Sequence, residues 1–166
     1  MNTVYVLIAN SDRRMNNLIE VAVRDVCYEQ LQVECSITGR LDEALHRGRL
    51  ENVGLIFLAP NHVVIGPPQR AVAASMNDAT RGIQTIKSRR SVPIIAVGVR
   101  PDHELELLEA GADAVLGILF DREKLRFEIR RGLGLHEQLQ ESEPEAPSRW
   151  SLANSFFRGL GKPRQN

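Results

Sequence analysis

Apolar residues along this chain form short uninterrupted runs that alternate with longer segments of mixed polarity. The run at residues 55–58 contains no polar position, which is typical of a strand buried on both faces of a parallel sheet. Residues 4–9, 92–99 and 114–119 predict further buried strands, whereas residues 32–37 alternate apolar with polar positions, as an edge strand does. The pattern therefore predicts five strands, with the run at residues 55–58 in the middle of the sheet.

Helical periodicity fills the segments between these strands. Apolar residues recur at helical spacing in five segments, which predict helices at residues 13–29, 41–48, 78–89, 102–110 and 122–133. Asp12, Asp102 and Asp121 stand where helix N-caps belong, and Gly111 stands where a left-handed residue ends a helix. The boundaries of the first, fourth and fifth helices are thus marked by residues with the right local chemistry.

Residues 62–80 are the least regular part of the pattern. The sequence Gly66-Pro67-Pro68 breaks an apolar stretch, and residues 71–74 favour the beginning of a helix.

In the predicted helix at residues 102–110, we expect Leu105 and Leu108 to point toward the core.

Strand and helix alternate five times, which implies parallel strands joined by right-handed crossovers in a three-layer α/β sandwich. We assign this domain to residues 1–136. Residues 137–148 are rich in Gln, Glu, Ser and Pro, and they predict a flexible acidic linker. Residues 149–166 form an amphipathic C-terminal segment. Its apolar positions include Trp150, Phe156, Phe157 and Leu160.

The overall composition narrows the function classes. The 166 residues include 21 Lys plus Arg and 21 Asp plus Glu, so the chain lacks the basic surplus expected of a nucleic-acid-binding protein. No apolar run reaches the length of a transmembrane helix, and residues 1–3 lack the features of a signal peptide. We therefore expect a cytoplasmic protein in which Cys27 and Cys35 are small buried apolar residues, with a disulfide between them as the less favoured alternative.

Candidate catalytic chemistry is sparse. In parallel sheets chemistry lies beyond the carboxyl ends of the strands, and the run at residues 55–58 ends in Ala59-Pro60-Asn61, which offers no carboxylate, nucleophile or base. His62 and His103 have no partner at ligand spacing in the sequence, so we interpret them as surface or loop histidines. Phosphate-binding and nucleophile-elbow motifs are absent, and we expect no enzyme activity, metal or cofactor.

The chain resembles the receiver domain of bacterial two-component response regulators over residues 3–135. The resemblance is carried by residues 92–97 (Val-Pro-Ile-Ile-Ala-Val), residues 109–113 (Glu-Ala-Gly-Ala-Asp) and Phe120-Asp121, in this order and spacing. It implies a flavodoxin-like fold with a five-stranded parallel sheet in the order 2-1-3-4-5.

The resemblance also implies where phosphotransfer chemistry belongs, and there this sequence departs from the family. Receivers bind Mg²⁺ with acidic residues after the first strand, accept a phosphoryl group on an aspartate after the third, and use a Thr or Ser and a Lys after the fourth and fifth. The matching positions hold Asn10, Ser11, Ala59, Gly98 and Ile118. Asp12, one residue further on, is either an N-cap, which we favour, or a residual metal ligand. We interpret the chain as a pseudo-receiver that cannot be phosphorylated.

Two segments are candidates for partner binding. Arg122, Arg126 and Arg130 form a basic row on the last helix, which is either a solvated face or part of an interaction surface. In receivers, the face formed by the fourth helix, fifth strand and fifth helix carries output and dimer contacts.

The aromatic residues of the C-terminal segment also predict a contact. Three contacts are open for this segment: its own domain, a protein partner or second copy, or a membrane surface. We expect a phosphorylation-independent protein-interaction module in bacterial signalling. The alternatives are a small-molecule-binding or enzymatic flavodoxin-like domain and a localisation factor anchored by the C-terminal segment.

Overall fold

The computed structural model describes residues 2–47 and 52–135, in which strands and helices alternate along the chain. The principal elements are β1 (Thr3–Ala9), α1 (Arg13–Cys27), β2 (Gln32–Thr38), α2 (Leu41–Arg47), β3 (Val53–Leu58), α3 (Met76–Lys87), β6 (Ile94–Val99), α4 (Glu104–Ala110), β7 (Ala114–Gly117) and α5 (Arg122–Leu133). A short hairpin of β4 (Val64–Ile65) and β5 (Val72–Ala73) lies between β3 and α3.

The five long strands form one parallel sheet in the order β2-β1-β3-β6-β7. Numbered without the hairpin strands, this is the order 2-1-3-4-5, so the predicted fold and the central place of residues 55–58 are confirmed. The buried strand β3 lies between β1 and β6, where helices cover both of its faces.

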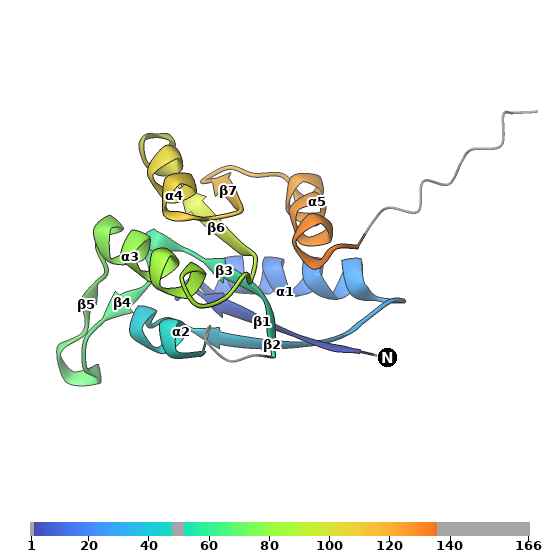
Figure 1. The fold of residues 1–166 in the computed structure, drawn as a ribbon, viewed down its shortest axis with the longest axis horizontal. Helices are drawn as coiled ribbons and strands as arrows, with labels where there is room; N and C mark the ends of the chain where they lie inside the picture. The colour runs from blue at the N-terminus through green and yellow to red at the C-terminus, as the bar shows by residue number, and fades with distance from the viewer. Residues whose placement is uncertain (1, 48–51, 136–166) are drawn as a thin grey trace, which may run out of the picture. The chain divides into compact units, whose positions relative to one another are not determined.

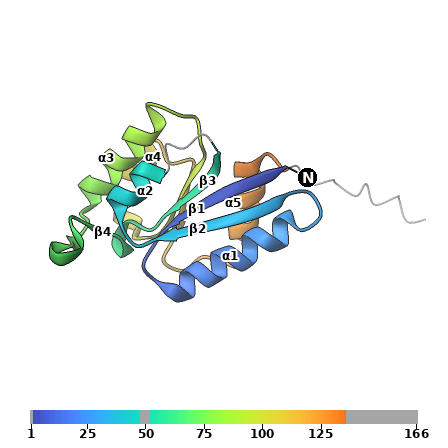
Figure 2. The same cartoon turned by 90° about the horizontal axis from the view of Figure 1, so that it is seen from below.

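Helices lie on both faces of the sheet (Figures 1 and 2), and each face carries an apolar core. Phe57 and Leu55 of β3 join the side chains of α1 and α5 on one face, where Ile19 and Leu125 are fully buried. The opposite face packs against α2, α3 and α4. The first helix is marked by the strong apolar stripe expected of a helix that covers a sheet.

Local signals for the helix boundaries are mostly confirmed. The side chain of Asp12 accepts hydrogen bonds from the backbone of Arg14 and Met15, and the side chain of Asp121 accepts one from Lys124. Gly111 ends α4 in the left-handed conformation with φ 111°. These ends are local, so the residue that caps each one could be recognised without knowledge of the packing.

The expectation of a helix starting at residues 71–74 is wrong. Val72 and Ala73 form strand β5, which pairs antiparallel with β4, and α3 begins only at Met76. Ser75 and Asp78 form a capping box there, in which each residue bonds the backbone N–H of the other. The capping box is a stronger signal for the start of a helix than the apolar residues 71–74, and it places the chain before Ser75 outside α3.

Three further expectations, two for helix α4 and one for the fifth long strand, are also wrong. Leu105 and Leu108 point outward, with 67% and 46% of their surface exposed, and Leu107 takes the core position. A 3₁₀ turn at Pro101–His103 precedes α4, so Asp102 is not its cap. The fifth long strand ends at Gly117, two residues earlier than expected.

Both cysteines are free thiols, so the disulfide alternative is wrong. Cys27 is buried and Cys35 half-buried, and burial raises the pKa of both. For Cys35 the pKa reaches about 11, because burial and the nearby Glu20 both disfavour the thiolate.

Within the described part of the chain, none of the helices has the length and apolar character needed to cross a bilayer. The predicted linker and C-terminal segment, with Trp150, Phe156, Phe157 and Leu160, lie outside the described residues.

Candidate functional site

The carboxyl ends of β1, β3 and β6 bring together the residues that replace receiver chemistry. Asn10 follows β1 and is 1% exposed, and its amide donates to Asn16 Oδ1 (2.9 Å) and accepts from the backbone of Asp12 (3.0 Å). Asn16 in turn donates to the backbone carbonyl of Asn10 at 3.1 Å. Two buried amides therefore satisfy each other at the position where the family holds a pair of carboxylates around a cation.

Asp12 belongs to the helix, as the capping interpretation predicts. Its Oδ1 accepts from the N–H groups of Arg14 (2.8 Å) and Met15 (3.4 Å) at the N-terminus of α1. Two backbone donors occupy this oxygen, so the carboxylate stabilises α1 where the helix dipole favours a negative charge.

The residue at the position that matches the phosphoacceptor of receivers is buried as well as uncharged. Ala59 is fully buried, and its N–H donates to the carbonyl of Ala9 at 2.9 Å. Two residues on, the Asn61 amide donates to the carbonyl of Gly98 at 3.3 Å, joining the ends of β3 and β6. None of the side chains of Ala59, Asn61 and Gly98 carries a carboxylate or a hydroxyl.

Backbone hydrogen bonds tie together the loops that follow β1, β2 and β3. Asn10 N–H donates to Thr38 (2.8 Å), Ser11 N–H donates to His62 (2.8 Å), and Val64 N–H donates to Gly39 (2.9 Å). Each bond joins segments that belong to different strand ends, so the backbone groups at this edge of the sheet are paired with one another.

Gly98 departs from the family in its backbone as well as its side chain. It has φ +66° and lies where the pairing of β6 with β7 shifts register, between Ala96 and Val99. A left-handed glycine at such a shift is typical of a β-bulge. A threonine or serine there would be strained, so the hydroxyl that receivers use does not fit this backbone.

Ile118 is not part of this cluster. It lies just beyond β7 and is 59% exposed, and the next residue, Leu119, is 97% exposed. The structure therefore gathers Asn10, Ser11, Asp12, Ala59 and Gly98 at one edge, and leaves Ile118 on the surface of the domain.

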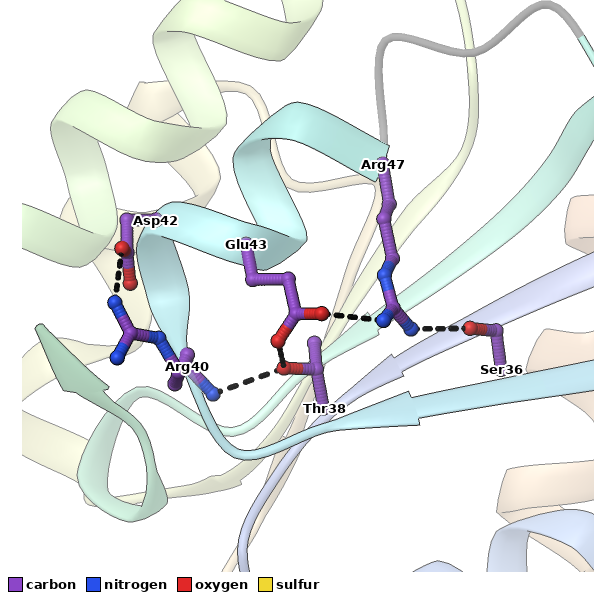
Figure 3. Close-up of polar contacts among 6 residues, drawn as sticks. All are labelled: Ser36, Thr38, Arg40, Asp42, Glu43 and Arg47. Carbon is purple, nitrogen blue, oxygen red and sulfur yellow. Dashed lines mark hydrogen bonds and ion pairs between the residues drawn. The ribbon is translucent and has the colours of Figure 1, made fainter. Parts of the chain in front are cut away.

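A second polar cluster connects β2 to α2 (Figure 3), and the sequence did not indicate it. The Thr38 hydroxyl donates to Glu43 at 2.7 Å, Glu43 pairs with Arg47, and Arg47 donates to the Ser36 hydroxyl at 2.7 Å. The hydrogen bond from Thr38, with the positive charge of Arg47, holds the pKa of Glu43 below its ordinary value. A Glu–Arg pair at i, i+4 on α2 was the available signal.

The arginine row of α5 lies beside α1. Arg126 pairs with Asp25 of α1 and with Glu123 at 3.1 Å, and Arg122 lines the same small hollow together with Val21. Arg130, further along, is half-buried. The guanidinium of Arg126 is thus already paired within the domain.

Exposed apolar side chains lie on α4, on the turn after β7, and on α5. We name this set the α4–β7–α5 face. It consists of Leu105, Leu108, Ile118, Leu119 and Phe127. The side chain of Glu104 approaches Gly117, which places the start of α4 beside the end of β7. Helices α4 and α5 lie on either side of β7 in Figure 1, and these helices with the turn after β7 carry five of the nine large apolar side chains that are exposed among the described residues.

His103 lies in the 3₁₀ turn before α4, but the expectation that it lacks an acid partner is wrong. Its ring nitrogens lie 3.7 Å from Asp102 and 3.5 Å from Glu106. These groups do not form a metal-binding cluster of three or more among the described residues. His62 is exposed in the loop after β3, as predicted.

No protein-family model and no curated protein matches this sequence. Solved structures do match the fold. The receiver domain of a sensor histidine kinase from Pseudomonas aeruginosa PAO1, with magnesium coordinated in its active site cleft, is 20% identical, covering 80% of this chain and 98% of that one (TM-score 0.58). A CheY-like receiver domain from Methanospirillum hungatei is 20% identical, covering 80% and 95% (TM-score 0.59). The NtrX receiver domain from Brucella abortus is 15% identical, covering 79% and 99% (TM-score 0.60).

These likenesses, with the observed strand order, establish a receiver fold for residues 2–47 and 52–135. Within that fold, this chain carries amides, an alanine and a left-handed glycine at the carboxyl ends of β1, β3 and β6.

Proposed function

We propose that this chain is a pseudo-receiver, a phosphorylation-independent protein-interaction module in bacterial two-component signalling. The observation that carries the proposal is the neutral, hydrogen-bonded edge at Asn10, Ala59 and Gly98. A cation and a phosphoryl group both require charged ligands there, and the chain supplies amides that are already bonded to each other.

The hydrogen bonds among the side chains at this edge of the sheet also argue against a small-molecule-binding or enzymatic function. The amides of Asn10 and Asn16 point at each other, and the amide of Asn61 is bonded to Gly98. A ligand site needs polar groups that converge on a free position. These amides are occupied within the protein, so we favour a role in binding other proteins in the cytoplasm.

The α4–β7–α5 face is the surface we propose for the partner. Leu119 is almost fully exposed, and Phe127 is 55% exposed, although both are apolar. Glu104, Glu106 and Glu109 place negative charge beside this apolar surface on α4. A partner would cover the leucines and phenylalanine and meet the acidic rim with basic groups. The C-terminal segment is a second proposed contact region.

The first experiment tests phosphorylation. The full chain is incubated with acetyl phosphate and Mg²⁺, and its intact mass is measured. We expect no added phosphate, because Ala59 offers no acceptor oxygen. A phosphorylatable receiver domain treated in parallel controls for the donor. A stoichiometric adduct on this chain would refute the proposal.

The second experiment tests the face. Binding partners are captured from the native host with the wild-type chain, Leu119→Lys and Ile37→Lys. Both substitutions place a charge at an exposed apolar position, but Ile37 lies on the edge strand β2, at the opposite edge of the sheet from β7. We expect Leu119→Lys alone to lose the specific partner. Equal capture by all three chains would exclude the α4–β7–α5 face.

A further inference from the structure

The α4–β7–α5 face combines exposed apolar side chains with negative charge. Leu119 is 97% exposed in the turn after β7, and Leu105 is 67% exposed on α4. Helix α4 also carries Glu104, Glu106 and Glu109, and none of them pairs with a lysine or an arginine among the described residues. An occupant of this face therefore needs apolar groups together with positive charge.

Residues 149–166 of the same chain have this composition. Their large apolar residues are Trp150, Leu152, Phe156, Phe157 and Leu160. They also include four basic residues and no acidic one. The basic residues are Arg149, Arg158, Lys162 and Arg164. Apolar area and positive charge thus occur together in one short stretch of the chain, as the face requires.

The end of α5 lies close to this face. Phe127, which belongs to the face, is six residues before Leu133, the last residue of α5. Six residues extend about 9 Å along a helix axis. Residues 136–148 come between the domain and Arg149, and a linker of this length spans about 20 Å on average. Residues 149–162 therefore have enough chain before them to reach the face.

We propose that residues 149–162 bind the α4–β7–α5 face of their own chain and compete there with the protein partner. The aromatic residues cover Leu119 and Phe127, and the basic residues meet the glutamates of α4. This inference rests on the proposed function, because it assigns a self-inhibiting contact to the face that we propose for the partner.

The linker allows a weak contact to keep the face covered. A short linker holds two groups at an effective concentration of about 1 mM. A contact with a dissociation constant of about 0.1 mM is then formed about 90% of the time. The apparent affinity of the face for an external partner falls about tenfold as a result. The face is thereby restricted to partners that bind it more tightly than residues 149–162 do.

Fluorescence of Trp150 tests the contact, because Trp150 is the only tryptophan of the chain. Emission and acrylamide quenching are measured on the full chain for wild type, Leu119→Lys and Ile37→Lys. Ile37 is also an exposed apolar residue, but it lies on β2, at the opposite edge of the sheet from β7. We expect a blue-shifted, protected indole in wild type and Ile37→Lys at every protein concentration, and a loss of at least half of this protection in Leu119→Lys.

A second pair of variants tests the charge. Glu109→Lys and Glu34→Lys change the net charge equally at exposed positions, but Glu34 lies on β2. Only Glu109→Lys should increase the quenching of Trp150, and added salt should reduce the difference between Glu109→Lys and wild type.

Several results would overturn the proposal. A solvated indole in the wild-type chain excludes the contact, and protection that grows with protein concentration assigns it to a second copy. Equal protection in Leu119→Lys and wild type, or equal quenching in Glu109→Lys and Glu34→Lys, places the segment elsewhere. None of these results changes the phosphorylation or capture experiments, so the proposed function can stand when this inference fails.

Discussion

Substitution of Gly98 by alanine tests whether the loss of receiver chemistry extends to the backbone. Gly98 has φ +66°, a conformation that costs an L-residue about 1–2 kcal/mol. Replacing glycine also restricts the unfolded chain, which returns about 0.4–1 kcal/mol. The net destabilisation expected from the backbone therefore lies between about 0 and 1.6 kcal/mol.

The surroundings of Gly98 add little to this value. A Cβ atom built there lies 3.4 Å from the terminal methyl of Met15, which is an ordinary contact. Gly134 provides a matched control, because it has nearly the same backbone angle, φ +65°, and nothing within 4 Å of the added carbon. We expect Gly98→Ala and Gly134→Ala to lose similar stability.

Equilibrium urea denaturation measures both effects. The free energy of unfolding is obtained from the midpoint and slope for wild type and each variant, and an unchanged slope shows that only stability has altered. If Gly98→Ala were neutral or stabilising while Gly134→Ala was destabilising, the left-handed assignment of Gly98 would be refuted.

The same reasoning extends to an attempted restoration of the receiver site. Gly98→Thr places a β-branched residue in the left-handed region, where its cost exceeds that of alanine. We therefore expect Asn10→Asp, Ala59→Asp and Gly98→Thr combined to yield an unstable chain rather than a phosphorylatable receiver. Intact mass after acetyl phosphate treatment, alongside the denaturation midpoint, distinguishes these results.

Four further predictions concern packing, titration and the C-terminal segment. Leu58→Ala should cost about 2–5 kcal/mol in urea denaturation, because Leu58 is 4% exposed in the core; a negligible shift would contradict its packing. The lowered pKa of Glu43 stabilises the fold above the ordinary carboxyl pKa, and this contribution is lost as pH falls through the folded value; Thr38→Val should reduce that acid dependence in pH-resolved denaturation. Cys35, with its pKa of about 11, should react slowly with a thiol reagent at neutral pH until the chain is unfolded, and equal rates in both states would contradict its burial. Docking of the C-terminal segment predicts a blue shift of Trp150 fluorescence, and emission of a solvated indole with and without host extract or anionic vesicles would exclude it.

The sequence by itself determined the features that depend on a few neighbouring residues. The buried run at residues 55–58 became the central strand β3, and alternating residues at 32–37 became the edge strand β2. Asp12 and Asp121 cap the N-termini of α1 and α5, and Gly111 ends α4, as predicted. A cap bonds backbone groups within three or four residues, so its chemistry is readable along the chain. The absence of a phosphoacceptor aspartate at the end of β3 could also be read from the sequence, because it depends only on the identity of residue 59.

Tertiary structure decided which face the leucines of α4 show and which backbone conformation Gly98 adopts. Leu105 and Leu107 are chemically the same, and only the position of α4 against the sheet buries Leu107 and leaves Leu105 exposed. The left-handed angle of Gly98 depends on how β6 pairs with β7. Arg126 was predicted on a basic row, but its pairing depends on Asp25, distant in the sequence, on the adjacent helix. These outcomes are set by contacts between segments far apart in the chain, which local periodicity does not encode.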